Sequence, residues 1–195
     1  GRLVARVGQD SLCVRPDTPL SHPIAFGPMA DWKSLGGGMR DITVDTEGRM
    51  YGIDTSGDVY EAQGPDLWAG ISLGSGLLRL DVVDKVFWGV TASGAALRFT
   101  DGWQDTGGDL SDVGVGGPEG DIVYGVGNGS VYRWDENSGW ASVAGSGVRI
   151  DVDGTGTAWV VQQDGSVLQR IAGNSNEFVQ VAPVPGGAAD ISAGL

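Results

Sequence analysis

Short apolar segments alternate with polar turns along the whole chain. Four stretches read alike, because each has an apolar run, a polar turn that contains glycine, and a second run in which apolar and polar residues alternate. Two such runs around a glycine turn are typical of a β-hairpin. The pattern therefore predicts hairpins at residues 50–60, 87–97, 123–132 and 158–168.

A fifth, degenerate copy opens the chain. Residues 3–7 lead through a polar turn into residues 11–14, and Asp10 stands where the other copies have the turn glycine. Aspartate also tolerates turn geometry. From turn to turn the intervals are 47, 37, 35 and 36 residues, and the path from the last turn through both chain ends back to Asp10 is 40 residues. These intervals account for all 195 residues, so five units fill the chain.

Two further strand-like segments flank each hairpin. The segments upstream share alternating apolar residues and are found at 41–44, 79–82, 112–115, 149–152 and 190–193. The segments downstream each begin at an aromatic residue, namely Trp32, Trp68, Trp103, Trp140 and Phe178. Four strands in a unit of about 39 residues are typical of a propeller blade.

The sequence therefore predicts an all-β fold, a five-bladed β-propeller of four-stranded antiparallel blades, as one domain over residues 1–195. The expected blades are approximately 41–78, 79–111, 112–148, 149–189, and 190–195 together with 1–40. The last blade combines both chain ends, because the C-terminal strand is expected to pair with the N-terminal strands. Such closure of the ring removes open sheet edges.

Two repeats carry a recognisable family pattern. In one, Trp140 opens the outer strand, Ile-Asp-Val follows at 150–152, Trp-Val-Val at 159–161 and Gly-Ser-Val at 165–167. The other has Trp103, Val-Gly-Val at 113–115, Tyr-Gly-Val at 124–126 and Gly-Ser-Val-Tyr at 129–132. This pattern resembles the tectonin-like β-propeller lectin family, and the blade count is similar to that of tachylectin-2-like lectins. The N-terminal copy departs from it.

The resemblance implies a non-catalytic carbohydrate-binding protein with several similar pockets between the blades. Its partners would be glycans or glycoconjugates, including those on microbial surfaces. A WD40 interpretation fits less well, because Trp-Asp occurs once, at 134–135, and the Gly-His dipeptide is absent from the sequence. Two other functions stay open: a protein–protein interaction platform, or an engineered propeller without a selected ligand.

Four aromatic residues recur at one position, the start of the second strand of each full repeat: Tyr51, Trp88, Tyr124 and Trp159. A flat ring near the end of a blade can stack on the apolar face of a sugar. The competing interpretation is that these rings fill the space between neighbouring blades, since every blade needs the same filler. Trp32, Trp68, Trp103, Trp140 and Phe178 are expected to be structural.

Composition narrows the partners and the compartment. The chain has 12 basic and 25 acidic residues, a formal charge of −13. Nucleic acids and anionic membranes are therefore poor partners. No apolar stretch approaches the length of a membrane span. We expect a monomer. A single cysteine, Cys13, cannot form an internal disulfide, so a soluble protein in the cytoplasm, or secreted without disulfides, fits equally. No signal peptide is recognisable at the start.

The sequence offers little catalytic chemistry. His22 is the only histidine, so a Ser-His-Asp triad or a histidine metal site would depend on it, and it lies outside the repeats. The acidic turns at 45–48 and 151–154 resemble calcium loops only faintly, and ordinary turn chemistry explains them. A paired-carboxylate hydrolase stays open because Asp and Glu are plentiful, although no pair stands out from the turn residues. We expect no enzyme activity, no cofactor and no metal.

Overall fold

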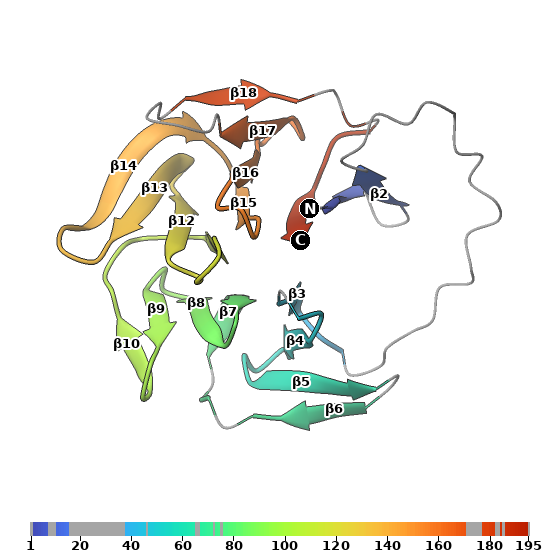
Figure 1. The fold of residues 1–195 in the computed structure, drawn as a ribbon, viewed down its shortest axis with the longest axis vertical. Coiled ribbons are helices and arrows are strands. Elements are labelled where there is room, and N and C mark those ends of the chain that lie inside the picture. The colour runs from blue at the N-terminus through green and yellow to red at the C-terminus, as the bar shows by residue number, and fades with distance from the viewer. Residues whose placement is uncertain are drawn as a thin grey trace.

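The computed structural model consists of antiparallel strands and the turns between them. It describes residues 2–7, 11–15, 38–45, 47–64, 67–71, 73–74, 76–170, 177–181, 184 and 186–194, and of residues 2–15 only the backbone is described. Figure 1 shows the sheets arranged around a common centre, with one strand of each sheet near that centre and the others farther out. This arrangement is that of a β-propeller.

Four of the sheets are complete four-stranded antiparallel blades. Blade 1 consists of β3 (Asp41–Val44), β4 (Met50–Ile53), β5 (Val59–Gly64) and β6 (Leu67–Gly70). Blade 2 consists of β7 (Leu77–Val83), β8 (Val86–Thr91), β9 (Ala96–Phe99) and β10 (Trp103–Asp105). Blade 3 consists of β11 (Asp112–Gly116), β12 (Ile122–Gly127), β13 (Ser130–Asp135) and β14 (Gly139–Ser146). Blade 4 consists of β15 (Arg149–Val152), β16 (Ala158–Val161), β17 (Val167–Arg170) and β18 (Phe178–Gln180). The predicted blade pattern is therefore confirmed for these four units.

A fifth sheet brings the two ends of the chain together. Its three described strands lie in the order β19 (Asp190–Gly194), β1 (Arg2–Val7) and β2 (Ser11–Arg15). The antiparallel register runs from Arg2 opposite Gly194 to Arg6 opposite Asp190. The C-terminal strand thus pairs with the N-terminal strand as expected, and both chain ends lie near the centre in Figure 1. The outer strand expected at Trp32 lies outside the described residues.

The inner strands of blades 2, 3 and 4 pack apolar side chains on the second strand of the preceding blade. Leu80 and Val82 of β7 share one buried cluster with Tyr51 and Ile53 of β4. Equivalent clusters join β11 to β8 and β15 to β12. Burying one side chain of this size contributes about 1.5–3 kcal/mol, so these clusters hold neighbouring blades together.

The inner strand of blade 1 departs from this rule. Ile42 and Val44 occupy the same two positions on β3, yet they are 46% and 44% exposed. The equivalent side chains of β7, β11, β15 and β19 are buried. The junction between blade 1 and the fifth sheet is therefore less well covered than the other junctions.

The turn between the second and third strand of each full blade requires glycine. Gly57, Gly94, Gly129 and Gly165 all have a positive φ, between 78° and 85°, which residues with a Cβ rarely adopt. Each carbonyl oxygen also accepts a hydrogen bond from an amide in the segment that follows the same blade, as at Gly94, where the amide of Leu110 lies 2.8 Å away. The repeated glycine of the sequence therefore fixes both the turn and the start of the next blade.

Glycine is also required where β11 passes close to the inner strand of blade 4. A Cβ at Gly116 would lie 2.3 Å from the carbonyl oxygen of Asp153 and 2.6 Å from that of Val152. We expect Gly116→Ala to lower the free energy of unfolding by about 2–3 kcal/mol, because overpacking against backbone cannot relax easily. Gly70→Ala is the matched control, since the nearest atom to its Cβ, on Tyr60, lies 3.5 Å away. Urea denaturation of both variants tests this, and an equal effect at the two sites would contradict it.

Candidate functional site

The inner strands surround a central cavity of about 520 Å³. All five sheets contribute to its wall through β3, β7, β11, β15 and β19. Met39, Ile42 and Met50 form apolar parts of the wall, and Thr43 and Ser192 add hydroxyl groups. A cavity of this size with convergent polar groups is the usual form of a small-molecule site.

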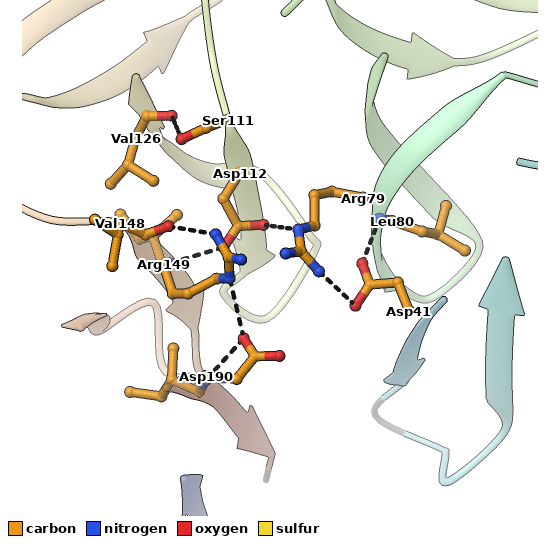
Figure 2. Close-up of polar contacts among 11 residues, drawn as sticks. Asp41, Arg79, Leu80, Ser111, Asp112, Val126, Val148, Arg149 and Asp190 are labelled. Carbon is orange, nitrogen blue, oxygen red and sulfur yellow. Dashed lines mark hydrogen bonds and ion pairs between the residues drawn. The ribbon is translucent and has the colours of Figure 1, made fainter. Parts of the chain in front are cut away.

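Charged side chains alternate around one end of this cavity. The first residues of the inner-strand segments form what we call the Asp–Arg ring, which consists of Asp41, Arg79, Asp112, Arg149 and Asp190. Arg79 lies between two acids, 3.4 Å from Asp41 and 3.9 Å from Asp112. Arg149 lies 3.6 Å from Asp190. Figure 2 shows both arginines between the carboxylates of neighbouring blades.

Asp112 is the most enclosed member of the Asp–Arg ring. Burial raises the pKa of its carboxyl to about 8, and the negative charge of Asp41 adds to this rise, while Arg79 and Arg149 oppose it. One of its oxygens, Oδ2, accepts a hydrogen bond from the amide of Ile150 at 3.0 Å. Asp112 therefore takes part in the packing of blade 3 against blade 4 as well as in the charge of the cavity.

Two further carboxyl groups of the cavity wall, each two residues farther along its strand than a ring arginine, lie close together. Asp81 and Asp151 hydrogen-bond to one another, and Gly114 on β11 leaves room for this approach, since a Cβ there would lie 2.6 Å from the Cα of Asp151. Burial raises the pKa of Asp81 to about 6. Burial, together with the charge of Asp81, raises the pKa of Asp151 well above its usual range. The pair is therefore stable when at least one of the two groups carries a proton.

The buried acids also bridge successive blades through backbone amides. Asp41 accepts from Leu80 at 3.0 Å, Asp81 from Val115 at 2.6 Å, and Asp151 from Ala193. With the bond from Ile150 to Asp112, each of the four junctions from blade 1 round to β19 has one such bridge. Among the described residues, none links Asp190 to β3; Asp190 accepts instead from Ile191 of its own strand at 3.1 Å.

Three of the four aromatic residues proposed for sugar stacking lie inside the packing between blades. Tyr51, Trp88 and Tyr124 are 3%, 1% and 0% exposed. Trp88 meets Trp134 and Trp140 edge to face, with ring centroids 5.6 and 5.9 Å apart. The faces of these three rings are therefore covered by protein, as the packing interpretation requires, and a contact with sugar stays a prediction.

Trp159 is the exception among the four. It is half-buried, and its indole Nε1 donates a hydrogen bond to Asp153 Oδ2 at 3.1 Å. The carboxylate of Asp153 also accepts from the amides of Thr155 and Thr157, each at 2.9 Å. This turn therefore uses its acidic residue to hold its own backbone and Trp159.

The first acidic turn has the same character. Asp45 accepts from the amides of Glu47 and Arg49, each at 2.9 Å, and from the Arg49 side chain at 2.6 Å. In the part of the chain that the structure describes, no three His, Cys, Asp or Glu side chains are grouped to hold a metal ion. His22 and its loop lie outside that part. Nor do the described residues form a helix that could span a membrane.

A second, smaller cavity of about 280 Å³ lies between blades 3 and 4. Ser146, Gln162, Gln163 and Asp164 give it a polar wall beside the turn at Gly129. No atom comes within 4 Å of a Cβ placed on Gly129, whereas the equivalent turns at other junctions are filled, for example by the side chain of Asp109 at Gly94. The sequence predicts similar pockets between the blades. The pocket between blades 3 and 4 is polar, and no aromatic residue lines it.

The Asp–Arg ring was not among the residues singled out from the sequence. Its signal was present, because aligning the five inner-strand segments places Asp, Arg, Asp, Arg and Asp at one position. Equivalent positions of the inner strands face the shared centre of a propeller. Charge at such a position therefore indicates a charged central cavity.

Comparison with known proteins supports the fold. No family model and no curated protein matches the sequence. Among solved structures, YCF48 from Cyanidioschyzon merolae is similar at a TM-score of 0.53 and 18% identity, over 80% of this chain and 60% of YCF48. A symmetrical protein described for its de novo evolutionary emergence is similar at a TM-score of 0.58 and 13% identity, over 97% of this chain and 92% of that one. The SapL1 lectin, solved with α-methyl fucoside, is similar at 0.51 and 19% identity, over 77% and 64%.

These similarities define the class of the protein as a β-propeller. The chain spans only about 60% of the length of YCF48. At identities below 20%, a shared propeller does not carry a shared ligand, because one fold serves many functions.

Proposed function

We propose that the protein is a non-catalytic carbohydrate-binding protein and that its site is the central cavity of the propeller. The observation that carries this proposal is the mixed wall of the 520 Å³ cavity. Guanidinium and carboxylate groups bind vicinal hydroxyls through paired hydrogen bonds, and apolar side chains such as Met39 and Met50 suit the C–H face of a sugar ring. The propeller fold is compatible with this function, since the SapL1 lectin shares it.

The buried acids Asp81 and Asp151 do not suit a hydrolytic role, and the binding proposal does not depend on them. Asp81 accepts from the Thr43 hydroxyl at 2.6 Å, from the amides of Val82 and Val115, and bonds to Asp151. Asp151 accepts from the amides of Val152 and Ala193. General acid–base catalysis needs a carboxyl group within reach of the reacting atoms, whereas these carboxyl groups are already occupied by the protein.

The proposal includes the five-bladed ring. The sheet of β19, β1 and β2 has the strand order of the first three strands of a blade, with β19 next to the cavity. We infer that it is the fifth blade; the segment expected to form its outer strand, at Trp32, lies outside the described residues. The chain then closes by pairing its two ends, which leaves no strand edge exposed at the junction.

A glycan array followed by isothermal titration calorimetry tests the function. We expect saturable binding to at least one class of glycan, at least tenfold weaker in Ile42→Trp, because the larger side chain would occupy the cavity that Ile42 lines. Val179→Trp on β18 is the matched control, since Val179 is 45% exposed and does not line the cavity, while Ile42 is 46% exposed. Thermal melts check that both variants fold.

Two results would count against the proposal. A well-folded protein that binds no glycan on the array would favour the protein-interaction alternative. Glycan binding that survives Ile42→Trp would place the site elsewhere, with the polar pocket between blades 3 and 4 as the next candidate.

A further inference from the structure

The turn between the second and third strand of blade 3 differs from the equivalent turns of the other complete blades. Gly127 on β12 lies opposite Ser130 on β13, so only Asn128 and Gly129 form the loop between the strands. Both have a positive φ, 49° for Asn128 and 78° for Gly129, as a type I′ turn requires. Both residues are exposed, and apart from chain neighbours no atom lies within 4 Å of a Cβ placed on Gly129. The loop is therefore open to solvent.

The amide of Gly129 has no hydrogen-bond acceptor among the described residues. In the other complete blades the equivalent glycine amide donates to the carbonyl oxygen three residues earlier, at 3.1 Å for Gly57, 3.0 Å for Gly94 and 2.9 Å for Gly165. An exposed amide without an acceptor can lose its proton to a base in the solvent, and the resulting nitrogen anion is a nucleophile. By closing a five-membered ring, this nitrogen reaches Cγ of the preceding residue, Asn128.

We propose that Asn128 is a site of spontaneous deamidation in the folded protein. The backbone nitrogen of Gly129 bonds to Cγ of Asn128, its own proton passes to solvent base, and the side-chain nitrogen leaves as ammonia with a proton from water. Water then opens the succinimide ring at one of its two carbonyl carbons, which gives aspartate or isoaspartate at position 128. The net reaction consumes one water and releases one ammonia. The site goes beyond the proposed function, since neither residue lines the central cavity.

The product changes two contacts of the loop. Asn128 Nδ2 donates to Asp109 Oδ2 at 2.9 Å, and a carboxylate in its place faces a like charge and repels it. Isoaspartate also routes the main chain through Cβ, which adds one atom to a loop whose length fixes the strand register. The carbonyl oxygen of Gly129 accepts from the amide of Gly147, between β14 and β15, at 3.1 Å. Deamidation should therefore loosen the link between this loop and the start of blade 4.

Asn137 is a matched site within the same blade. It is exposed, lies in the turn between β13 and β14, and is the only other asparagine among the described residues. The amide that follows it, that of Ser138, donates to Asp135 Oδ1 at 2.9 Å. This hydrogen bond must open before the nitrogen can attack. The fold should therefore slow deamidation at Asn137 and leave it unslowed at Asn128.

Peptide mass spectrometry of the protein during incubation at pH 7 tests the proposal. The rate at each site is divided by its rate in the chain unfolded with guanidinium chloride, which removes the intrinsic difference between glycine and serine as the following residue. We expect a ratio within about threefold of one at Asn128 and about tenfold lower at Asn137, because one hydrogen bond that must open first slows the reaction by about that factor. A ratio at Asn128 as low as that at Asn137 overturns the proposal, since the type I′ turn would then protect its own asparagine.

Asn128→Gly is the matched variant, because glycine also adopts the positive φ of this turn and offers no side-chain amide. The loop peptide of this variant should show no conversion of an amide to an acid, and thermal melts check that it folds. A conversion that persists in this peptide overturns the assignment to Asn128.

Hydrogen exchange at the Gly147 amide, followed by NMR, tests the structural consequence. We expect exchange about tenfold faster in the deamidated protein than in fresh protein, which is the effect of losing one hydrogen bond. Exchange that is unchanged would overturn the predicted loosening at blade 4.

Discussion

Trp88→Ala is expected to lower the free energy of unfolding by about 3–5 kcal/mol, which is the usual effect of deleting a fully buried large aromatic side chain. Trp88 is the largest of the fully buried side chains. Its ring contacts Trp134 and Trp140 of the next blade, and the guanidinium of Arg98 lies 5.7 Å from its centroid. The cavity left behind would lie between two blades that are fixed by their own hydrogen bonds, so it could collapse only in part. Urea denaturation monitored by circular dichroism measures the loss.

Trp88→Phe is the matched variant for this experiment. The indole Nε1 of Trp88 has no hydrogen-bond partner among the described residues, so a phenyl ring retains the aromatic contacts without leaving a polar group unpaired. We expect it to cost less than half of the loss caused by alanine. A loss below about 1 kcal/mol in Trp88→Ala, within the range of ordinary surface substitutions, would contradict the structural role and return Trp88 to the candidates for ligand stacking.

The recurring aromatic position shows what a repeat can and cannot reveal. The period located the strands, and it placed Tyr51, Trp88, Tyr124 and Trp159 at equivalent points. Equivalence alone does not separate packing from binding, because neighbouring blades impose the same packing requirement on every copy. What separates them is the distance between blades, which depends on residues of the next blade such as Val113 and Val115 beside Trp88.

Part of the central cavity could be predicted from the sequence. Its five inner-strand segments were located correctly as strands, and their first residues already spell the alternation of Asp and Arg. The pairing of Asp81 with Asp151 was not accessible, because the two residues lie on blades 2 and 4 and meet only across Gly114. A contact that skips a blade depends on how closely the inner strands converge, and the local pattern of apolar and polar residues does not record that distance.

The exposure of Ile42 and Val44 on β3 could not be predicted from the sequence either. Ile42 and Val44 have the same apolar pattern as the inner strands whose side chains are buried, so the sequence predicts a covered face. Coverage depends on the preceding blade, which for β3 is the degenerate first copy. In that copy Val4 holds the register position taken by Tyr51 and Trp88 in blades 1 and 2. Exposure of an inner strand therefore depends on a part of the chain that is distant in the sequence, and the strand's own pattern of apolar residues does not record it.

The buried acids predict an unusual dependence of stability on pH. Asp81, Asp112 and Asp151 all have a pKa raised by burial, so between pH 4 and 8 the folded chain holds protons that the unfolded chain releases. Stability from these groups is therefore fully present below the unfolded pKa of 3.8 and is lost as pH rises through the folded values, about 6 for Asp81 and about 8 for Asp112. We expect the free energy of unfolding in urea to be several kcal/mol lower at pH 8 than at pH 5.

Asp151→Asn separates this effect from the general repulsion of an acidic chain. An amide at position 151 can donate to Asp81 and accept from the amide of Ala193 without binding a proton, so the variant should be more stable than the parent protein at pH 8 and depend less on pH. The control is Asp164→Asn, because hydrogen bonds from Ser166 lower the pKa of Asp164 from its ordinary value, away from the range between pH 5 and 8. It removes the same formal charge but should leave the slope between pH 5 and 8 unchanged. A flat profile in the parent protein would mean that Asp81, Asp112 and Asp151 are all ionised in the folded state. Equal slopes in the two variants would assign the pH dependence to Asp112 or to net charge and not to the pair.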